Sequence, residues 1–97
     1  MKLSQNEIDF LKTFFSSKPV KRAFVFGSYS RGAGNQDSDL DILVELDYTK
    51  HIGLGFVKMK YEIEEALHKN VDLVSEQGVS RHIMPFINKD KQLIYER

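Results

Sequence analysis

Two hydrophobic segments joined by a short polar stretch constrain the fold of this chain most strongly. The first, residues 23–26 (AFVF), is continuous and ends at Gly27, as expected for a strand covered on both faces. The second, residues 39–46 (DLDILVEL), alternates, so that its aliphatic side chains share one face and Asp39 and Asp41 share the other. Because the aliphatic face must cover a core, both aspartates are predicted to project from the opposite face, near the strand's start.

The rest of the chain alternates between helical and strand patterns. Ser4 and Glu7 have the spacing of a capping box at the start of the first helix. The periodicity predicts helices over residues 4–17, 56–68 and 80–89, a short helix over 28–33, a loop over 35–38, and strands over 20–27, 39–46, 71–74 and 92–95. This order predicts an α+β (mixed α/β) fold, a single domain of residues 1–97 with a mixed sheet of about four strands backed by helices.

The two later helices carry more detailed expectations. In the helix at 56–68, with Asn70 as its stop, we expect a partly apolar stripe of Val57, Met59, Tyr61, Ile63, Ala66 and Leu67. In the helix at 80–89, Ser80 is the expected cap, and Pro85 must lie in the first turn or two. The side chains expected to face inward from that helix are Ile83, Met84, Phe86 and Ile87.

Composition excludes some classes of protein. Lys and Arg together number 14, as do Asp and Glu, so the formal net charge is zero, and no direct nucleic-acid binding is expected. The chain has no cysteine, which excludes disulfides and thiolate metal sites. Because the sequence also has no apolar run of membrane-spanning length and no signal-peptide pattern, we expect a cytoplasmic protein without a membrane partner.

Gly27 and Ser28 form a candidate phosphate-binding turn. A glycine at the end of a buried strand lets a bulky group approach the backbone. If a helix begins at Ser28, its first amides and the Ser28 hydroxyl can hold phosphate oxygens, and Arg31 can add charge-assisted contacts. The glycine spacing fits neither a Walker A loop nor a dinucleotide fingerprint. By itself, the pair is most often an ordinary strand-to-helix turn.

Asp39 and Asp41 form a candidate metal site. Side chains two residues apart on a strand point the same way, with their bases roughly 6.5–7 Å apart. Two carboxylates at that distance repel each other unless a cation lies between them, and Mg²⁺ prefers such oxygen ligands. Asp72 interrupts an apolar strand at 71–74, and it can reach the same site if that strand lies beside the one at 39–46. Each feature alone is common at strand ends, but together, in this order, they favour a metal–triphosphate site.

This combination resembles the nucleotidyltransferases of the polymerase β superfamily. The shared features are Gly27 and Ser28, ten further residues, then Asp39 and Asp41, and a later Asp72 within an apolar strand. The small size and the segments 27–32 (GSYSRG) and 38–44 (SDLDILV) resemble its smallest branch, the minimal nucleotidyltransferases (MNT), which are antitoxins of HEPN–MNT toxin–antitoxin pairs. Ser30 stands where that branch is expected to have alanine.

The resemblance implies a Mg²⁺-dependent protein adenylyltransferase that uses ATP. It implies that Gly27, Ser28 and Arg31 bind the nucleotide, and that Asp39, Asp41 and Asp72 are both catalytic residues and ligands of two Mg²⁺ ions. The implied acceptor is a hydroxyl, such as that of a tyrosine, on a HEPN ribonuclease toxin, which adenylylation silences. The implied partner is therefore this toxin.

Two alternatives remain open from the sequence. The chain could be a catalytically vestigial antitoxin that neutralises its partner by binding, although clustered carboxylates have no purpose in steric inhibition. It could instead transfer nucleotides to a small molecule such as an aminoglycoside, although it carries no second domain to bind one.

Overall fold

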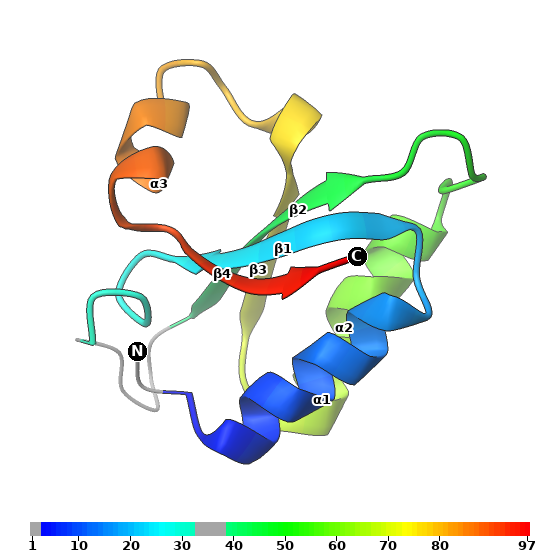
Figure 1. The fold of residues 1–97 in the computed structure, drawn as a ribbon, viewed down its shortest axis with the longest axis horizontal. Coiled ribbons are helices and arrows are strands. Elements are labelled where there is room, and N and C mark those ends of the chain that lie inside the picture. The colour runs from blue at the N-terminus through cyan, green and yellow to red at the C-terminus, as the bar shows by residue number, and fades with distance from the viewer. Residues whose placement is uncertain (1–2, 33–38) are drawn as a thin grey trace.

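Within the part of the chain that the computed structural model describes, residues 3–32 and 39–97, four strands form one mixed sheet in the order β3-β2-β1-β4 (Figure 1). The elements are α1 (Gln5–Ser16), β1 (Val20–Phe26), β2 (Leu40–Leu46), α2 (Gly55–Leu67), β3 (Val71–Ser75), the 3₁₀ turn η1 (Glu76–Gly78), α3 (Met84–Asp90) and β4 (Gln92–Glu96). Strand β1 is antiparallel to β2 and β4, whereas β2 and β3 are parallel. The predicted α+β fold with a mixed four-stranded sheet is therefore confirmed. The expected loop at 35–38 lies outside the described residues.

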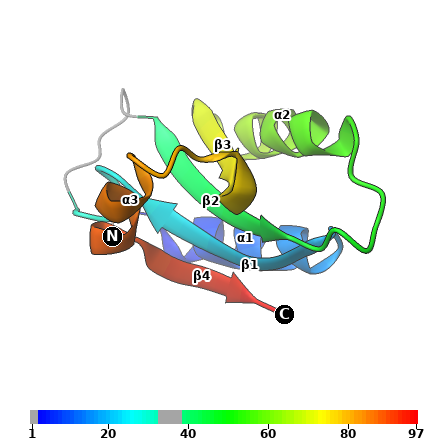
Figure 2. The same ribbon diagram turned by 90° about the horizontal axis from the view of Figure 1, so that it is seen from above.

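Helices pack on both faces of this sheet. The main core joins α1 and α2 to one face, and it includes Leu11 and Phe15 of α1 and Ile63 of α2. Helix α3 lies on the other face (Figure 1), where a smaller cluster of side chains joins it to the sheet. Figure 2 shows β3 and β4 at opposite edges of the sheet, so the two inner strands, β1 and β2, are covered most completely.

The alternating segment forms β2 with its faces as predicted. The aliphatic face is 7% exposed or less at each of its four positions, which are Leu40, Ile42, Val44 and Leu46. On the opposite face, Leu43 is only 1% exposed because it packs with Phe24 and Ile87 in the smaller cluster. That face is therefore apolar in its middle, and Asp41 lies at its edge.

Helix α1 begins at the predicted capping box. The Ser4 hydroxyl accepts a hydrogen bond from the Glu7 amide at 3.1 Å, and the Glu7 carboxylate accepts one from the Ser4 amide at 2.9 Å. Leu11 and Phe15, four residues apart on one helical face, are fully buried. Local sequence therefore determines both the start of this helix and its buried face.

The predicted apolar stripe of α2 is wrong in part. Met59 and Ile63 are buried, but Val57 and Tyr61 are 46% and 59% exposed. Residues two apart on a helix are separated by roughly 200° around its axis, so one stripe cannot bury all four side chains. The helix also ends before Asn70, because His68 adopts the left-handed conformation (φ 55°) directly after Leu67.

Helix α3 is shorter than predicted. It begins at Met84 rather than Ser80, whose hydroxyl instead accepts a hydrogen bond from the His82 amide in the preceding turn. Pro85 lies in the first turn, as required. Ile87 is buried, but Ile83 and Phe86 are 52% and 72% exposed, so the predicted burial of those two side chains is wrong.

None of the helices in the described ranges combines the length and apolar character that a membrane crossing needs.

Candidate active site

The parallel pairing of β2 with β3 brings two predicted site residues side by side. Asp41 and Asp72 are direct partners in the strand register. Neighbouring strands lie about 4.8 Å apart, and side chains at paired positions project from the same face. The strand that carries Asp72 therefore lies beside the strand that carries Asp41, as the predicted site requires. Asp39 comes immediately before β2, which begins one residue later than predicted, and its side chain is exposed.

The surroundings of Asp41 raise the pKa of its carboxyl group. Burial, followed by the charges of Asp72 and Asp39, raises the pKa of Asp41 to about 6, and Arg31 acts in the opposite direction. The ionised form of Asp41 is thus destabilised by both desolvation and like charge. A cation among these carboxylates would relieve both effects.

Gly27 forms the wall of the site next to Asp41. Its φ of +73° lies in the left-handed region that favours glycine, and a methyl group at this position would overlap Oδ2 of Asp41. Phe26, the last residue of β1, is also the strand partner of Asp41. The Asp41 carboxylate therefore lies directly against the backbone of the Gly27 turn, and only a residue without a side chain leaves room for it.

Residues 27–32 form a turn, so the short helix predicted over 28–33 is wrong for the residues that the structure describes. The Arg31 amide donates to the Gly27 carbonyl at 3.1 Å, and the Gly32 amide to the Tyr29 carbonyl at 3.2 Å. Gly32 has a φ of +76°, which ends any helical path. The predicted end of that helix, Ala33, lies outside the described residues. Because no helix begins at Ser28, a helix dipole does not support phosphate binding here. The side chain of Ser28 lies half-buried in the turn beside Gly27.

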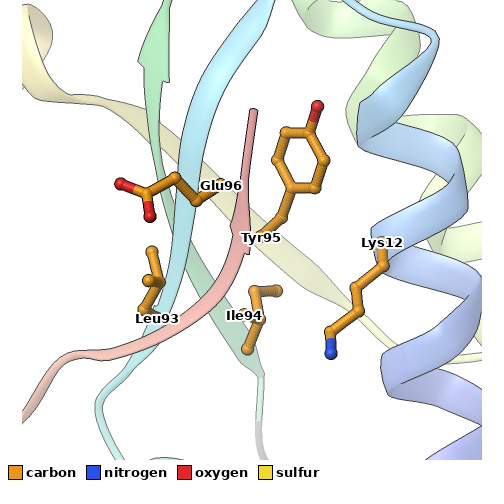
Figure 3. Close-up of a pocket in the computed structure, with 5 residues that line it drawn as sticks. All are labelled: Lys12, Leu93, Ile94, Tyr95 and Glu96. Atoms are coloured by element: carbon orange, nitrogen blue, oxygen red, sulfur yellow. The ribbon is translucent and has the colours of Figure 1, made fainter.

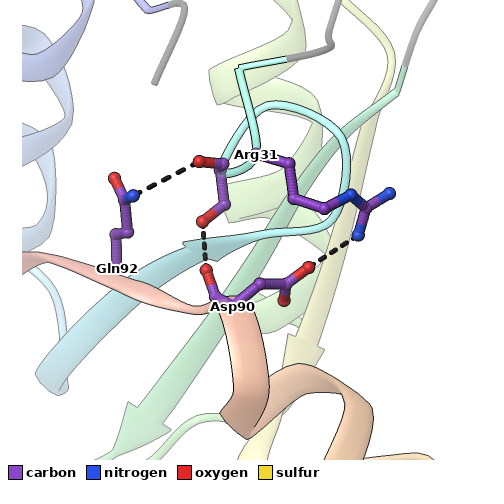
Figure 4. Close-up of polar contacts among 4 residues, drawn as sticks. Arg31, Asp90 and Gln92 are labelled. Atoms are coloured by element: carbon purple, nitrogen blue, oxygen red, sulfur yellow. Dashed lines mark hydrogen bonds and ion pairs between the residues drawn. The ribbon is translucent and has the colours of Figure 1, made fainter.

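Arg31 is held by a residue that the sequence did not single out. Its guanidinium forms an ion pair with the Asp90 carboxylate at 2.6 Å (Figure 4). The Ser30 hydroxyl donates to the backbone carbonyl of Asp90, and the Gln92 side-chain amide donates to the Ser30 carbonyl at 3.2 Å. Asp90 stands in a polar run, residues 88–91 (NKDK), where nothing local distinguishes it from a solvated residue.

A cavity of about 160 Å³ lies between the Gly27 turn and α3, and Arg31, Phe86 and Asp90 contribute to its lining. A second cavity, of about 350 Å³, lies between β4 and α1 (Figure 3). The lining of this second cavity includes Lys12 and Tyr95 but none of the predicted site residues. The smaller cavity is therefore the one that belongs to the candidate site.

The three candidate aspartates fit Mg²⁺ in their chemistry. Within residues 3–32 and 39–97, no three His, Asp or Glu side chains already converge as a finished ligand set. The strand register nevertheless places Asp41 beside Asp72, and Asp39 lies two residues before Asp41. Carboxylates that repel one another in the absence of a cation are suited to Mg²⁺, which takes oxygen ligands and completes its shell with water and phosphate.

Comparisons with known proteins identify the family of this chain. The family profile described as a nucleotidyltransferase domain matches residues 8–95. Over 60 residues the chain is 47% identical to a putative protein adenylyltransferase of Methanocaldococcus jannaschii. That match covers 62% of this chain and 63% of the relative, so it spans less than two thirds of the relative's length.

Two solved structures share the fold. One is a toxin–antitoxin crystal structure with AMP-PNP, with a TM-score of 0.78 and 22% identity over 98% of this chain and 75% of the matched chain. The other contains a tri-AMPylated HEPN toxin of Shewanella oneidensis in complex with an MNT antitoxin, with a TM-score of 0.75 and 18% identity over 98% and 74%. Because the family profile covers nearly the whole sequence, the predicted membership is confirmed: this chain belongs to the nucleotidyltransferase domain family.

Proposed function

We propose that this chain is a Mg²⁺-dependent protein adenylyltransferase that acts as an antitoxin. In this proposal it transfers AMP from ATP to a hydroxyl, that of a tyrosine, on a HEPN ribonuclease toxin. The observation that carries the proposal is the pairing of Asp41 with Asp72 against the Gly27 turn. The name of the M. jannaschii relative supports the activity. The contents of the two toxin–antitoxin structures support ATP and the HEPN partner.

The triphosphate of ATP would lie over the Gly27 turn. The half-buried backbone of Gly27 and the hydroxyl of Ser28 would contact its terminal phosphates, and Arg31 would add charge-assisted hydrogen bonds. Arg31 suits this role because its side chain is 59% exposed while one of its nitrogens is already held. These contacts would leave the α-phosphorus facing the aspartates of β2 and β3.

The carboxylates of Asp39, Asp41 and Asp72 would hold the Mg²⁺ ions, of which we expect two. Bound there, Mg²⁺ supplies charge neutralisation for the leaving group and polarises the phosphorus. Asp41, with a pKa of about 6, is ionised at neutral pH and available as a ligand.

The chemical step is an in-line displacement. The acceptor oxygen forms a bond to the α-phosphorus while the bond from that phosphorus to the bridging oxygen breaks. Pyrophosphate leaves with the electron pair, and Asp72 takes the proton of the acceptor hydroxyl. Asp72 suits this task because its side chain is exposed at the paired position next to Asp41, where a partner's hydroxyl can reach it. We expect the reaction to occur in the cytoplasm, where ATP is available.

The experiment that tests this function is transfer of label from α-³²P-ATP. The chain is co-purified with a HEPN-domain ribonuclease from the same genome, and the label on the partner is measured in the presence of Mg²⁺. We expect wild type to label the partner, and Asp41→Asn and Asp72→Asn each to lower the rate by about 10²-fold or more. We also expect a chelator to abolish labelling.

Asp9→Asn is the matched control, because it removes an equal charge from the exposed face of α1. It should label at the wild-type rate. Equal labelling by wild type, Asp41→Asn and Asp72→Asn would contradict the assigned site. Full protection of cells from the toxin by a complex that carries no label would favour neutralisation by binding. Labelling of a free small molecule in the absence of a partner would favour a small-molecule acceptor.

A further inference from the structure

The Gly27 turn is tied to a part of the molecule roughly sixty residues away in sequence. Three side-chain contacts join it to the junction of α3 and β4: the Arg31–Asp90 ion pair, the bond from the Ser30 hydroxyl to Asp90, and the bond from Gln92 to Ser30 (Figure 4). Asp90 takes part in two of these contacts, one through its carboxylate and one through its backbone. The turn that would bind phosphate is thus anchored mainly at Asp90.

Asp90 is well placed to orient Arg31. The side chain of Asp90 is 19% exposed, so it is partly enclosed, whereas that of Arg31 is 59% exposed. A guanidinium carries five N–H donors, and the bond at Nη1 engages only part of them. The charge of Arg31 also acts on Asp41, since it opposes the rise in the pKa of that carboxyl. Asp90 therefore holds one side of the guanidinium beside the site while other donors face solvent.

We propose that Asp90 is a positioning residue that aims Arg31 at the triphosphate. A free arginine side chain has several rotatable bonds, and ordering it on a ligand costs rotamer entropy. The ion pair with Asp90 orders Arg31 before ATP arrives, so less entropy is lost when the phosphates bind. This inference rests on the proposed function, because it assigns to Asp90 a role in binding the same ATP.

A double-mutant cycle tests the role of Asp90. Asp90→Ala, Arg31→Ala and the double variant are compared by KM and kcat for ATP in the labelling assay, and by direct titration of the isolated chain with Mg²⁺ and AMP-PNP. We expect Asp90→Ala to raise KM and the dissociation constant about tenfold, with kcat changed less than about twofold. Because Asp90 acts through Arg31, we expect the double variant to bind no worse than Arg31→Ala alone.

Two further variants separate positioning from a general structural role. Asp90→Asn keeps an oxygen acceptor for Arg31 and should give a KM between those of wild type and Asp90→Ala. Glu45→Ala is the matched control, because it removes the Arg22–Glu45 pair, which has the same 2.6 Å length and similar exposure but lies farther along the sheet. Its KM should equal that of wild type.

The inference is overturned if the effects of Asp90→Ala and Arg31→Ala add, since Asp90 would then act independently of Arg31. It is also overturned if Asp90→Ala lowers KM, because the pair would then hold Arg31 away from ATP. Thermal unfolding of each variant shows whether Asp90→Ala loses affinity for ATP only because it unfolds. In that case, the KM of Asp90→Asn compared with that of wild type decides whether Asp90 positions Arg31. Wild type that neither binds AMP-PNP nor labels a partner would instead refute the proposed function.

Discussion

At Asp41, three neighbours determine the chemistry of one carboxylate. Gly27 gives it room against the backbone, Asp72 pairs with it across the parallel strands, and Asp39 adds a second like charge. The burial of Asp41 and the two like charges cost stability in the protein without metal, because a partly buried carboxylate is charged beside other carboxylates. Such a cost is expected at a site that a cation and a triphosphate complete.

This cost predicts a dependence of stability on pH. The pKa of Asp41 is about 6 in the folded chain and about 3.8 in the unfolded chain. Between these values the folded state binds more protons, so the wild-type protein loses stability as pH rises through this range. Asp41→Asn removes that loss. We expect the variant to gain little stability over wild type near pH 4 and most above pH 6, as measured by denaturant unfolding in the presence of a chelator.

Asp47→Asn provides a control of opposite sign. Hydrogen bonds from Arg97 and then from Thr49 lower the pKa of Asp47, so its ionised form stabilises the fold. That contribution is present above the pKa of the unfolded chain and is lost as pH falls. Asp47→Asn should therefore be less stable than wild type at pH 7, with a difference that shrinks on acidification. A stability change for Asp41→Asn that is the same at all pH values would contradict the assignment.

Among the elements, α1 and the Gly27 turn are determined in different ways. Helix α1 has its start signal in its own sequence, since Ser4 and Glu7 cap each other. The Gly27 turn has no comparable signal in its own sequence, and contacts with α3 and β4 accompany its conformation. A local substitution should therefore affect α1 without affecting the site.

Ser4→Ala tests the local determination of α1. Loss of the cap should lower the free energy of unfolding by about 1 kcal/mol, because the Glu7 amide loses its acceptor. Binding of AMP-PNP by the folded protein should be unchanged. Ser16→Ala, on the exposed last turn of the same helix, is the control and should stay within about 0.5 kcal/mol of wild type. Equal losses in the two variants would show that the capping box contributes nothing specific.

In the molecule as a whole, the sheet separates a large core from a small one. The small cluster of Phe24, Leu43 and Ile87 holds α3 on the face from which Asp41 projects. Because α3 ends at Asp90, the position of this short helix determines where Arg31 is held. Packing of α3 on the sheet therefore affects the geometry of the site.

Ile87→Ala tests this dependence. Truncation of a side chain that is 4% exposed should lower the free energy of unfolding by about 2–4 kcal/mol. It should also weaken AMP-PNP binding by the folded protein, because α3 no longer fixes Asp90. The control is Asn88→Ala on the same helix, because its side chain is exposed and does not line the cavity of the candidate site. It should change stability by less than about 0.5 kcal/mol and leave AMP-PNP binding unchanged. A destabilised Ile87→Ala variant with wild-type affinity would argue against the link.

The amino-acid sequence by itself determined the features that depend on neighbours within a few residues. The capping box of α1 and the two faces of β2 could be read from local spacing. Residue types alone allowed Gly27 and Ser28 to be proposed as a phosphate-binding turn, and Asp39 and Asp41 as metal ligands. Asp72 could be proposed as a third carboxylate because it interrupts an apolar strand, and the resemblance to nucleotidyltransferases joined these residues into one site. Helical and strand periods are properties of the backbone, so they leave their mark in the sequence.

Only the tertiary structure decided the features that depend on distant parts of the chain. The strand order paired Asp41 with Asp72, and packing chose which apolar side chains of α2 and α3 are buried. The ion pair of Arg31 with Asp90 joins residues 59 positions apart, and no local pattern distinguishes such an aspartate from a solvated one. The physical reason is that a contact of this kind exists only after both segments have docked on the same sheet, so its energy depends on the whole fold.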